Sequence, residues 1–530
     1  MWLASRVGDQ TIRSDPTRFT ERKRRLQQAW ERLRRTIERA DRRVFPWLIV
    51  GVYVLVVARA AAHHEMWRDE IQAWLLARDS SGLLDLCRNL KYEGHPGLWH
   101  LTLMPLTRIT WAPEIMQVWH LLIAATVMFL ILRYGPFPLP LRALIPFGYF
   151  AVFEYAVKCR NYALGWLLLT TAVLLYPHRR RLLPWIGLAL MLAAHTTVFP
   201  LIITIVLTGV LGLEALIELL RGRMDRSWGS LRPYAIGLGL ALFGILTSVV
   251  QIVPPEDTGF AVGWRFQWDP NHFKNVLLLY RRVWAPPHLD WLESSPYFGA
   301  LRWWVSGGIV VWTVALFWRR PFGLLFYLGA TAGVLAFNYV KYFGAIWHHG
   351  QLFVIFLLVH WMERASRPAE PMRGERWLFR FSNLALGGVL ILQLLSGIGV
   401  LQEDARRPFS NGKAAGRFLR EHGLTKRPIL GDYDAAVSTV VGYARLPKIF
   451  YARGERWGSF VVWDKARTQG VSQEQLMALW ERLGPETVLL TNYRVREELL
   501  APHGLQEWAA FTGAMVGDEN FFIYGQGPPP

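Results

Sequence analysis

Two adjacent carboxylates, Asp69 and Glu70, are the strongest candidates for catalysis in this chain. They follow the first long apolar run, Val44 to Ala62, by only a few residues. An ionised side chain beside a membrane span is costly and therefore indicates a function. Asp69 could serve as a general base that takes a proton from an attacking hydroxyl or amine. The simpler alternative is that both acids cap the helix that follows them.

Candidate substrate-binding residues lie near the predicted outer ends of later spans. Arg160 can hold a phosphate through a pair of hydrogen bonds, and Tyr162 can add another. Lys341 stands among aromatic residues in a second cationic cluster. The alternative for both cations is that their long side chains reach the membrane surface without binding a substrate. The remaining candidates are four histidines: His95, His195, His348 and His349.

A metal site is not predicted, although a divalent ion stays open as a cofactor. The residues His63, His64, Asp69 and Glu70 include ligand types that suit zinc or manganese. Their spacing matches no metal-binding signature, and adjacent histidines rarely converge on one ion. The chain has 2 cysteines without a CxxC pattern, which argues against a disulfide framework.

Composition indicates a polytopic membrane protein. Of the 530 residues, 52% are hydrophobic and only 19% are charged, whereas soluble proteins carry about 25% charged residues. The net charge of +19 comes from arginine-rich loops. Such loops set membrane topology and contact anionic lipid. Nucleic-acid binding is not predicted, because no aromatic–basic recognition motif accompanies the charge.

Hydrophobic runs predict about eleven transmembrane helices. The arginine-rich loops fall on one side of these spans, which predicts a cytoplasmic N-terminus and an external C-terminus. Opposite sides for the two ends require an odd number of spans. The stretch from His95 to Thr110 is therefore expected to be a juxtamembrane or re-entrant helix and not a further span. The predicted spans are 44–63, 114–133, 142–158, 161–177, 182–200, 201–220, 231–253, 300–318, 321–339, 349–363 and 381–401.

Three regions follow from these spans. Residues 1–43 form a basic cytoplasmic segment, with a helix expected on the inner leaflet from Thr20 to Arg43. Residues 44–401 form the membrane domain, with external loops 64–113 and 254–299. Residues 402–530 are expected to form an external α/β domain. Its strand-like runs are 428–433, 459–463, 487–491 and 521–524, and its helix-like runs are 412–421 and 473–483.

The order of four short motifs resembles the GT-C superfamily, in particular the branch of protein O-mannosyltransferases and lipid A aminoarabinose transferases. The motifs are Asp69-Glu70, His95-Pro96-Gly97-Leu98, Cys159-Arg160-Asn161-Tyr162 and His195-Thr196, and the resemblance is strongest over residues 44–220. The chain departs from the pattern where Gly97 replaces the second proline and Cys159 replaces an alanine. The resemblance implies a GT-C-like membrane glycosyltransferase with a polyprenyl-phosphate sugar donor. It also implies that Asp69 is the base, that Glu70 supports it and that Arg160 lies near the lipid phosphate.

We therefore predict a hexosyl- or pentosyltransferase, mannosyltransferase-like, of the bacterial inner membrane and cell envelope. It would transfer the sugar to a lipid, glycan or protein acceptor at the external face. The predicted donor-binding residues are Arg160, Tyr162, Lys341, His348, His349, His195 and His95. One alternative is a flippase or carrier of a lipid-linked sugar, for which symmetric halves with broken helices would be expected. Another is an inactive scaffold protein.

Overall fold

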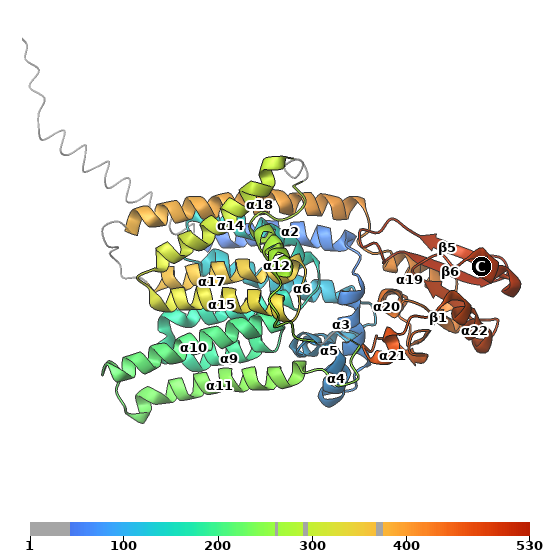
Figure 1. Cartoon of the computed structure of the whole chain (residues 1–530), viewed down its shortest axis with the longest axis horizontal. Helices are drawn as coiled ribbons and strands as arrows, with labels where there is room; N and C mark the ends of the chain where they lie inside the picture. The colour runs from blue at the N-terminus through green and yellow to red at the C-terminus, as the bar shows by residue number, and fades with distance from the viewer. Residues whose placement is uncertain (1–42, 260–262, 290–294, 367–374) are drawn as a thin grey trace, which may run out of the picture.

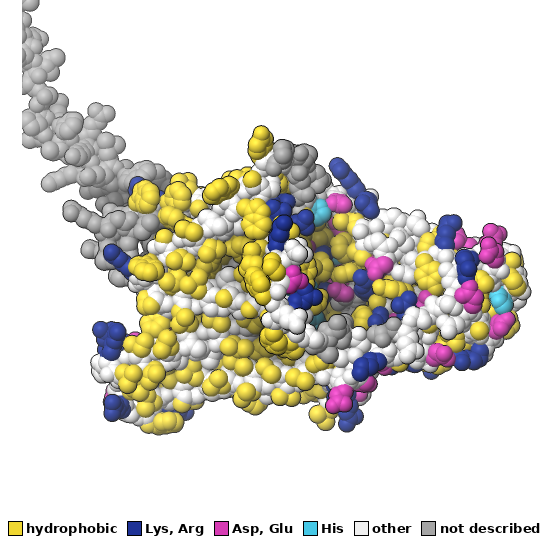
Figure 2. Space-filling view, in the orientation of Figure 1, with side chains coloured by type: hydrophobic (Ala, Val, Ile, Leu, Met, Phe, Trp, Pro, Cys, Tyr) yellow, Lys and Arg dark blue, Asp and Glu magenta, His cyan; other side chains and the backbone are white. Residues whose placement is uncertain are grey.

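The computed structural model describes residues 43–259, 263–289, 295–366 and 375–530. A long helical bundle is joined at one end to a smaller unit of strands and helices, residues 407–530, here called the C-terminal unit (Figure 1). The helix expected from Thr20 to Arg43 lies outside the described residues, apart from its last residue. Hydrophobic side chains cover much of the side of the bundle that is in view (Figure 2).

Seven of the described helices are long and apolar enough to cross a membrane. At 1.5 Å per residue, helices of this length match a hydrocarbon layer of about 30 Å. The chain is therefore an integral membrane protein with a mainly helical fold. The seven are α2 (Phe45–His63), α6 (Ile115–Tyr134), α10 (Val198–Leu220), α11 (Trp228–Ile252), α14 (Pro296–Phe317), α15 (Pro321–Val340) and α18 (Glu375–Arg406).

The other four predicted spans correspond to shorter helical segments. One is a broken segment made of α7 (Leu139–Leu144), η2 (Ile145–Phe147) and the π-helical η3 (Phe150–Val157). The others are α8 (Tyr162–Leu175), α9 (Arg179–Ala194) and α17 (Gln351–Ala365), with 14 to 16 residues each. In α17, every residue from Gln351 to Glu363 is buried. Neighbouring helices thus surround α17.

The first loop of the chain folds into short helices between the bundle and the C-terminal unit (Figure 1). The helix α5 has 12 residues, or about 18 Å, and is too short to span a membrane. The sequence predicted a helix of this kind between His95 and Thr110. The helices of the loop are α3 (Arg68–Asp79), α4 (Leu83–Asn89), η1 (Leu90–Tyr92) and α5 (Leu98–Ile109).

Shorter elements connect the remaining spans. The helix α12 (Pro270–Trp284) begins at Asp269, whose side chain accepts hydrogen bonds from two backbone N–H groups of the first turn. Proline at the first helical position suits this start, because its fixed φ is helical. The other connecting elements are η4 (Tyr176–His178) and α16 (Ile346–His349).

The C-terminal unit is a six-stranded mixed sheet with helices on both faces. The strand order is β3-β2-β1-β4-β6-β5, and β1 runs parallel to both β2 and β4. Successive strand residues alternate between two cores, as the pleat requires. The strands are β1 (Ile429–Gly431), β2 (Ile449–Tyr451), β3 (Arg456–Gly458), β4 (Val488–Thr491), β5 (Leu505–Phe511) and β6 (Phe521–Gln526). The helices are α19 (Gly412–Glu421), η5 (Leu424–Lys426), α20 (Asp434–Ala444), α21 (Lys465–Thr468), α22 (Gln473–Leu483), α23 (Glu497–Leu500) and η6 (Ala501–His503).

One predicted strand of this unit is wrong. The run 459–463 forms no strand, although its residues are largely apolar. Val461 donates its backbone N–H to the side chain of Gln72 and accepts a hydrogen bond from the same amide. A side chain of α3 therefore satisfies the backbone groups that a neighbouring strand would have satisfied.

The C-terminal unit and α3 share one hydrophobic core. Ile71 and Trp74 of α3 belong to the same buried cluster as Val437 and Val441 of α20. The approach is closest at Gly442, where an added Cβ would lie 2.4 Å from Cγ2 of Ile71. The first loop is therefore fixed between the bundle and the sheet.

We expect Gly442→Ala to destabilise the junction between α3 and α20. Alanine normally favours a helix over glycine by about 0.5–1 kcal/mol, but overpacking against branched Ile71 costs about 1–3 kcal/mol. The melting temperature of the detergent-solubilised protein should fall. Gly470→Ala is the matched control, because its new Cβ would meet no atom within 4 Å. Equal melting temperatures for the two variants would show that the close approach at Gly442 is unimportant.

Candidate active site

Asp69 and Arg160 form an ion pair at the junction between the bundle and the C-terminal unit. Asp69 is the second residue of α3, and its carboxylate accepts a hydrogen bond from Arg160, which lies just before α8. The Asp69 side chain is 33% exposed and that of Arg160 is 12% exposed. Between the two parts of the molecule the surface is hollowed, and charged side chains line the hollow (Figure 2). The two sequence-predicted residues are thus brought together.

Glu70, by contrast, is fully buried and holds backbone groups in place. One carboxylate oxygen accepts from the N–H of Cys159 at 2.6 Å. The other accepts from the N–H of Trp67 at 3.2 Å, which caps the start of α3. The helix-cap interpretation therefore applies to Glu70, whereas Asp69 is directed at Arg160.

His64 joins Glu70 to the end of α18. Its Nε2 lies 3.2 Å from Glu70 and its Nδ1 lies 3.0 Å from Asp404. Burial alone would lower the pKa of His64, but the two carboxylates outweigh this effect and raise its pKa to about 10. Both ring nitrogens therefore donate, and the buried imidazolium neutralises part of the acidic charge. Its neighbour His63 is exposed, so the adjacent histidines diverge.

Aromatic rings and an imidazole surround Arg160. Its guanidinium lies over the ring of Tyr162 at 5.5 Å. The ring of His348 packs edge-on against Tyr162 at 5.9 Å and against Tyr342 at 5.1 Å. The charges of Asp69 and Arg160 also act on the hydroxyl of Tyr342. The site thus combines one ion pair with flat apolar surfaces.

Two histidines on which the charge of Arg160 acts are neutral at pH 7. Burial and the charge of Arg160 lower the pKa of His95 to about 4. The same two causes hold the pKa of His348 well below its usual range. Neutral imidazoles can donate one N–H to a phosphate but supply no positive charge.

Glu93 belongs to this site but was not identified from the sequence. Its carboxylate accepts from Gln72 at 2.7 Å and from the indole of Trp463 at 3.1 Å. Burial raises its pKa to about 7, and the charges of Asp69 and Arg160 both act on it. A single loop glutamate gives no spacing signal, although it stands two residues before His95.

Lys158 is a second residue that the sequence analysis passed over. Its buried ammonium lies 3.0 Å from Glu154 and 4.5 Å from the ring centroid of Trp347. Its position two residues before Arg160 was the only signal in the sequence. The charge of Lys158 also contributes to keeping His348 neutral.

The other predicted donor-binding residues have local partners. His195 bonds to the carbonyl of Met191 at 2.8 Å and to Thr247 at 3.0 Å. His349 is buried and bonds to the carbonyl of Phe343 at 3.0 Å. Lys341 follows α15, and its ammonium lies 5.1 Å from the ring centroid of Trp264. A shared phosphate site for Lys341 and Arg160 stays a prediction.

Within the described residues, no group of three or more His, Cys, Asp or Glu side chains is arranged to hold a metal ion. In the set considered from the sequence, His64 and Glu70 bind each other, and Asp69 binds Arg160.

Comparisons with known proteins give one solved structure to report. Neither the family models nor the curated proteins give a match. The chain is similar to ArnT from Cupriavidus metallidurans, whose crystal structure was determined in the apo state. The TM-score is 0.48 and the sequence identity 11%, over 90% of this chain and 97% of that chain. A likeness with a TM-score under 0.5 decides neither the fold nor the activity, and the fold described above rests on the chain's own helices and strands.

We expect the stability of the protein to depend on the charge of His64. With a pKa raised from 6.5 to about 10, its proton stabilises the folded chain fully below pH 6.5. That stability is lost as the pH rises from 6.5 through about 10. His64→Gln leaves buried carboxylates without a cation and should cost about 3–5 kcal/mol at pH 6.5 or below.

The test is thermal unfolding of both proteins across this pH range. The difference in melting temperature between wild type and His64→Gln should shrink as the pH rises. His63→Gln serves as the control, since its side chain is exposed. A difference that stays constant over the range would show that His64 is neutral in the folded chain.

Proposed function

We propose that this protein is a GT-C-like glycosyltransferase that moves a sugar from a polyprenyl phosphate to an acceptor at the external membrane face. The Asp69–Arg160 pair at the end of the bundle is the observation that carries the proposal. A base and a phosphate-binding cation stand together there, beside helices that can hold a prenyl chain. The motif order and the resemblance described from the sequence support the same reaction. The proposed orientation has a cytoplasmic N-terminus and the C-terminal unit outside a bacterial inner membrane.

In this reaction Asp69 is the general base. The acceptor oxygen or nitrogen forms a bond to the anomeric carbon while its proton passes to the Asp69 carboxylate. The bond between that carbon and the phosphate oxygen breaks, and polyprenyl phosphate leaves with the electron pair. Because the phosphate is a good leaving group, the main tasks of the protein are positioning and charge stabilisation.

Arg160 has a second role in this proposal. In the chain alone its partner is Asp69. A donor phosphate that pairs with Arg160 takes over part of this ion pair and makes the Asp69 carboxylate available as a base. Donor binding and activation of the base are then one event. The neutral His95 and His348 can donate hydrogen bonds to the phosphate. Because these imidazoles carry no charge, the electrostatic attraction of the phosphate comes from Arg160.

The substitution Asp69→Asn tests the role of the base. Because a general base contributes about 10²- to 10⁴-fold to the rate, we expect a loss of that size with unchanged folding. The assay measures release of polyprenyl phosphate and transfer of labelled sugar to envelope fractions, with a panel of hexosyl and pentosyl donors. Asp85→Asn is the control, since Asp85 lies in the same loop and its carboxylate accepts hydrogen bonds from Ser81. Near-normal transfer by Asp69→Asn would rule out this role.

A double-mutant cycle tests the predicted phosphate site. Arg160→Gln and Lys341→Gln should each raise the KM for the donor, by about tenfold if each loses about 1.4 kcal/mol of binding. If both cations bind one phosphate, the double variant should lose less than the sum of the two single effects. Exposed Lys91→Gln is the control for charge alone. Strict additivity would separate Lys341 from the donor site, and no effect of Arg160→Gln would remove Arg160 as well.

A further inference from the structure

The carboxyl ends of the parallel strands in the C-terminal unit face the bundle. Asn492, directly after β4, donates to the carbonyl of Asp518 at 3.0 Å. The side chain of Asp518 pairs with Arg68 at 2.5 Å, and Arg68 is the neighbour of Asp69 in α3. The opposite end of the sheet, with the chain's C-terminus, lies at the far end of the molecule (Figure 1). The carboxyl ends of these strands therefore lie at the end of the sheet that is nearer to Asp69.

The strand order places a topological switch point at this edge. From β1 the chain continues through α20 to β2 on one side, and later reaches β4 on the other side of β1. Open α/β sheets bind their ligands at such a switch point, outside the carboxyl ends of the strands. The residues that follow β1, β2 and β4 are thus the ones to inspect.

Six polar and aromatic residues gather there, and we call them the switch-point cluster: Asp432, Tyr433, Asp434, Arg453, Arg467 and Tyr493. Asp432 is satisfied, because it accepts from Arg453 at 3.0 Å and from the hydroxyl of Tyr493 at 2.5 Å. Asp434, two residues further along the chain, is not satisfied in the same way.

Asp434 is buried with an unused acceptor. Its side chain is only 4% exposed, and its Oδ1 has no hydrogen-bond partner among the described residues. The nearest cation, Nε of Arg467, lies 3.6 Å from the other oxygen, which is beyond hydrogen-bond distance, and this Nε is also without a partner there. Burial raises the pKa of Asp434 to about 7. A buried polar atom without a partner is costly, so a bound ligand or water that supplies the partner stabilises this arrangement.

Both arginines of the cluster stack on aromatic rings. Arg453 lies over the ring of Tyr433 at 4.6 Å, and Arg467 lies over the indole of Trp463 at 4.0 Å. Tyr433 has a φ of 60°, which is a strained conformation for a residue with a side chain. Strain of this kind persists where the surroundings enforce it and is concentrated at ligand-binding sites.

Trp463 connects the cluster to the candidate active site. The ring that stacks on Arg467 donates its indole N–H to Glu93, and the charges of Asp69 and Arg160 both act on Glu93. One indole and one carboxylate thus separate the cluster from the ion pair. A ligand of the cluster would therefore lie on the Asp69 side of the C-terminal unit.

We propose that the switch-point cluster binds the sugar portion of the acceptor, a glycan recognised through its hydroxyl groups. This inference rests on the proposed function and names the class of its acceptor. The cluster combines two carboxyl groups with two guanidiniums and so carries no large excess of positive charge, which suits a hydroxyl-rich ligand better than a phosphate. Unused polar atoms can bond to hydroxyls, and flat rings offer packing surface with polar edges.

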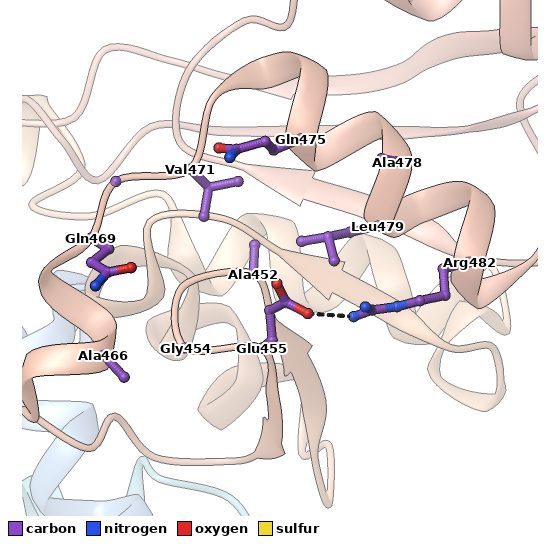
Figure 3. Close-up of a pocket in the computed structure, with 11 residues that line it drawn as sticks. Ala452, Gly454, Glu455, Ala466, Gln469, Val471, Gln475, Ala478, Leu479 and Arg482 are labelled. Carbon is purple, nitrogen blue, oxygen red and sulfur yellow. Dashed lines mark hydrogen bonds and ion pairs between the residues drawn. The ribbon is translucent and has the colours of Figure 1, made fainter.

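A neighbouring cavity provides an internal control. It measures about 660 Å³ and is lined by residues of the loop after β2, of α21 and of α22 (Figure 3). Its charged residues, Glu455 and Arg482, already pair with each other at 2.7 Å. Glu455→Gln therefore removes a charge from the same unit without touching the switch-point cluster.

The experiment measures binding of the full-length, detergent-solubilised protein to a broad array of immobilised neutral, amino and acidic oligosaccharides. Wild type and Asp69→Asn should bind the same glycans. Asp434→Asn and Arg467→Gln should each weaken that binding about tenfold or more, whereas Glu455→Gln should leave it unchanged. Since Asn resembles the protonated acid, Asp434→Asn should fold normally, which its melting temperature checks.

Several results would overturn the proposal: no binding to any glycan, binding unaffected by both cluster variants, or binding lost in Glu455→Gln, which would move the site to the cavity. The result is independent of transfer. If glycans bind through the cluster but Asp69→Asn retains full transfer, the proposed role of Asp69 fails and the binding site stands. If Asp69→Asn abolishes transfer but no glycan binds, the binding site fails alone.

Discussion

The geometry of the candidate site depends on one buried carboxylate, that of Glu70. It accepts hydrogen bonds from the backbone of Trp67 and Cys159 and pairs with His64, which in turn binds Asp404. A buried carboxylate is tolerated only when such partners compensate for its lost hydration. Asp69 is the chain neighbour of Glu70 and Arg160 that of Cys159. The bonds made by Glu70 therefore set the positions of both members of the ion pair.

The C-terminal unit closes this arrangement from the other side. Its helix α20 shares a core with α3, and its loop around Trp463 bonds to the first loop through Glu93. The loop before α12 also joins it, since Asp257 accepts from the N–H of Lys465 at 2.7 Å and Gly259 donates to Trp463 at 2.8 Å. Three segments far apart in the sequence thus enclose the junction. Arg160 is thereby largely buried, whereas the Asp69 carboxylate stays partly exposed at the junction.

This enclosure explains why the site contains few net charges. Arg160 is matched by Asp69, Lys158 by Glu154, and His64 by two carboxylates. His95 and His348 are held neutral by burial and by the nearby cations. A resting site built from matched pairs is stable without a ligand. In the proposed reaction, an incoming phosphate changes the partners within such a pair without creating an isolated buried charge.

The sequence by itself determined the membrane character and the order of the helical segments, and it singled out Asp69 and Arg160 as candidate site residues. These features follow from long apolar runs and from charges placed beside them, which are local properties of the chain. Only the tertiary structure decided that Glu70 accepts hydrogen bonds from backbone groups while Asp69 pairs with Arg160. Adjacent side chains of a helix point in different directions, so the two acids meet different partners. The tertiary structure also brought in Glu93 and Lys158, and it replaced the expected strand at 459–463 with bonds to Gln72. The bonds of Gln72 to Val461 and of Trp463 to Glu93 join residues 389 and 370 positions apart, and their energies depend on a burial that no local pattern records.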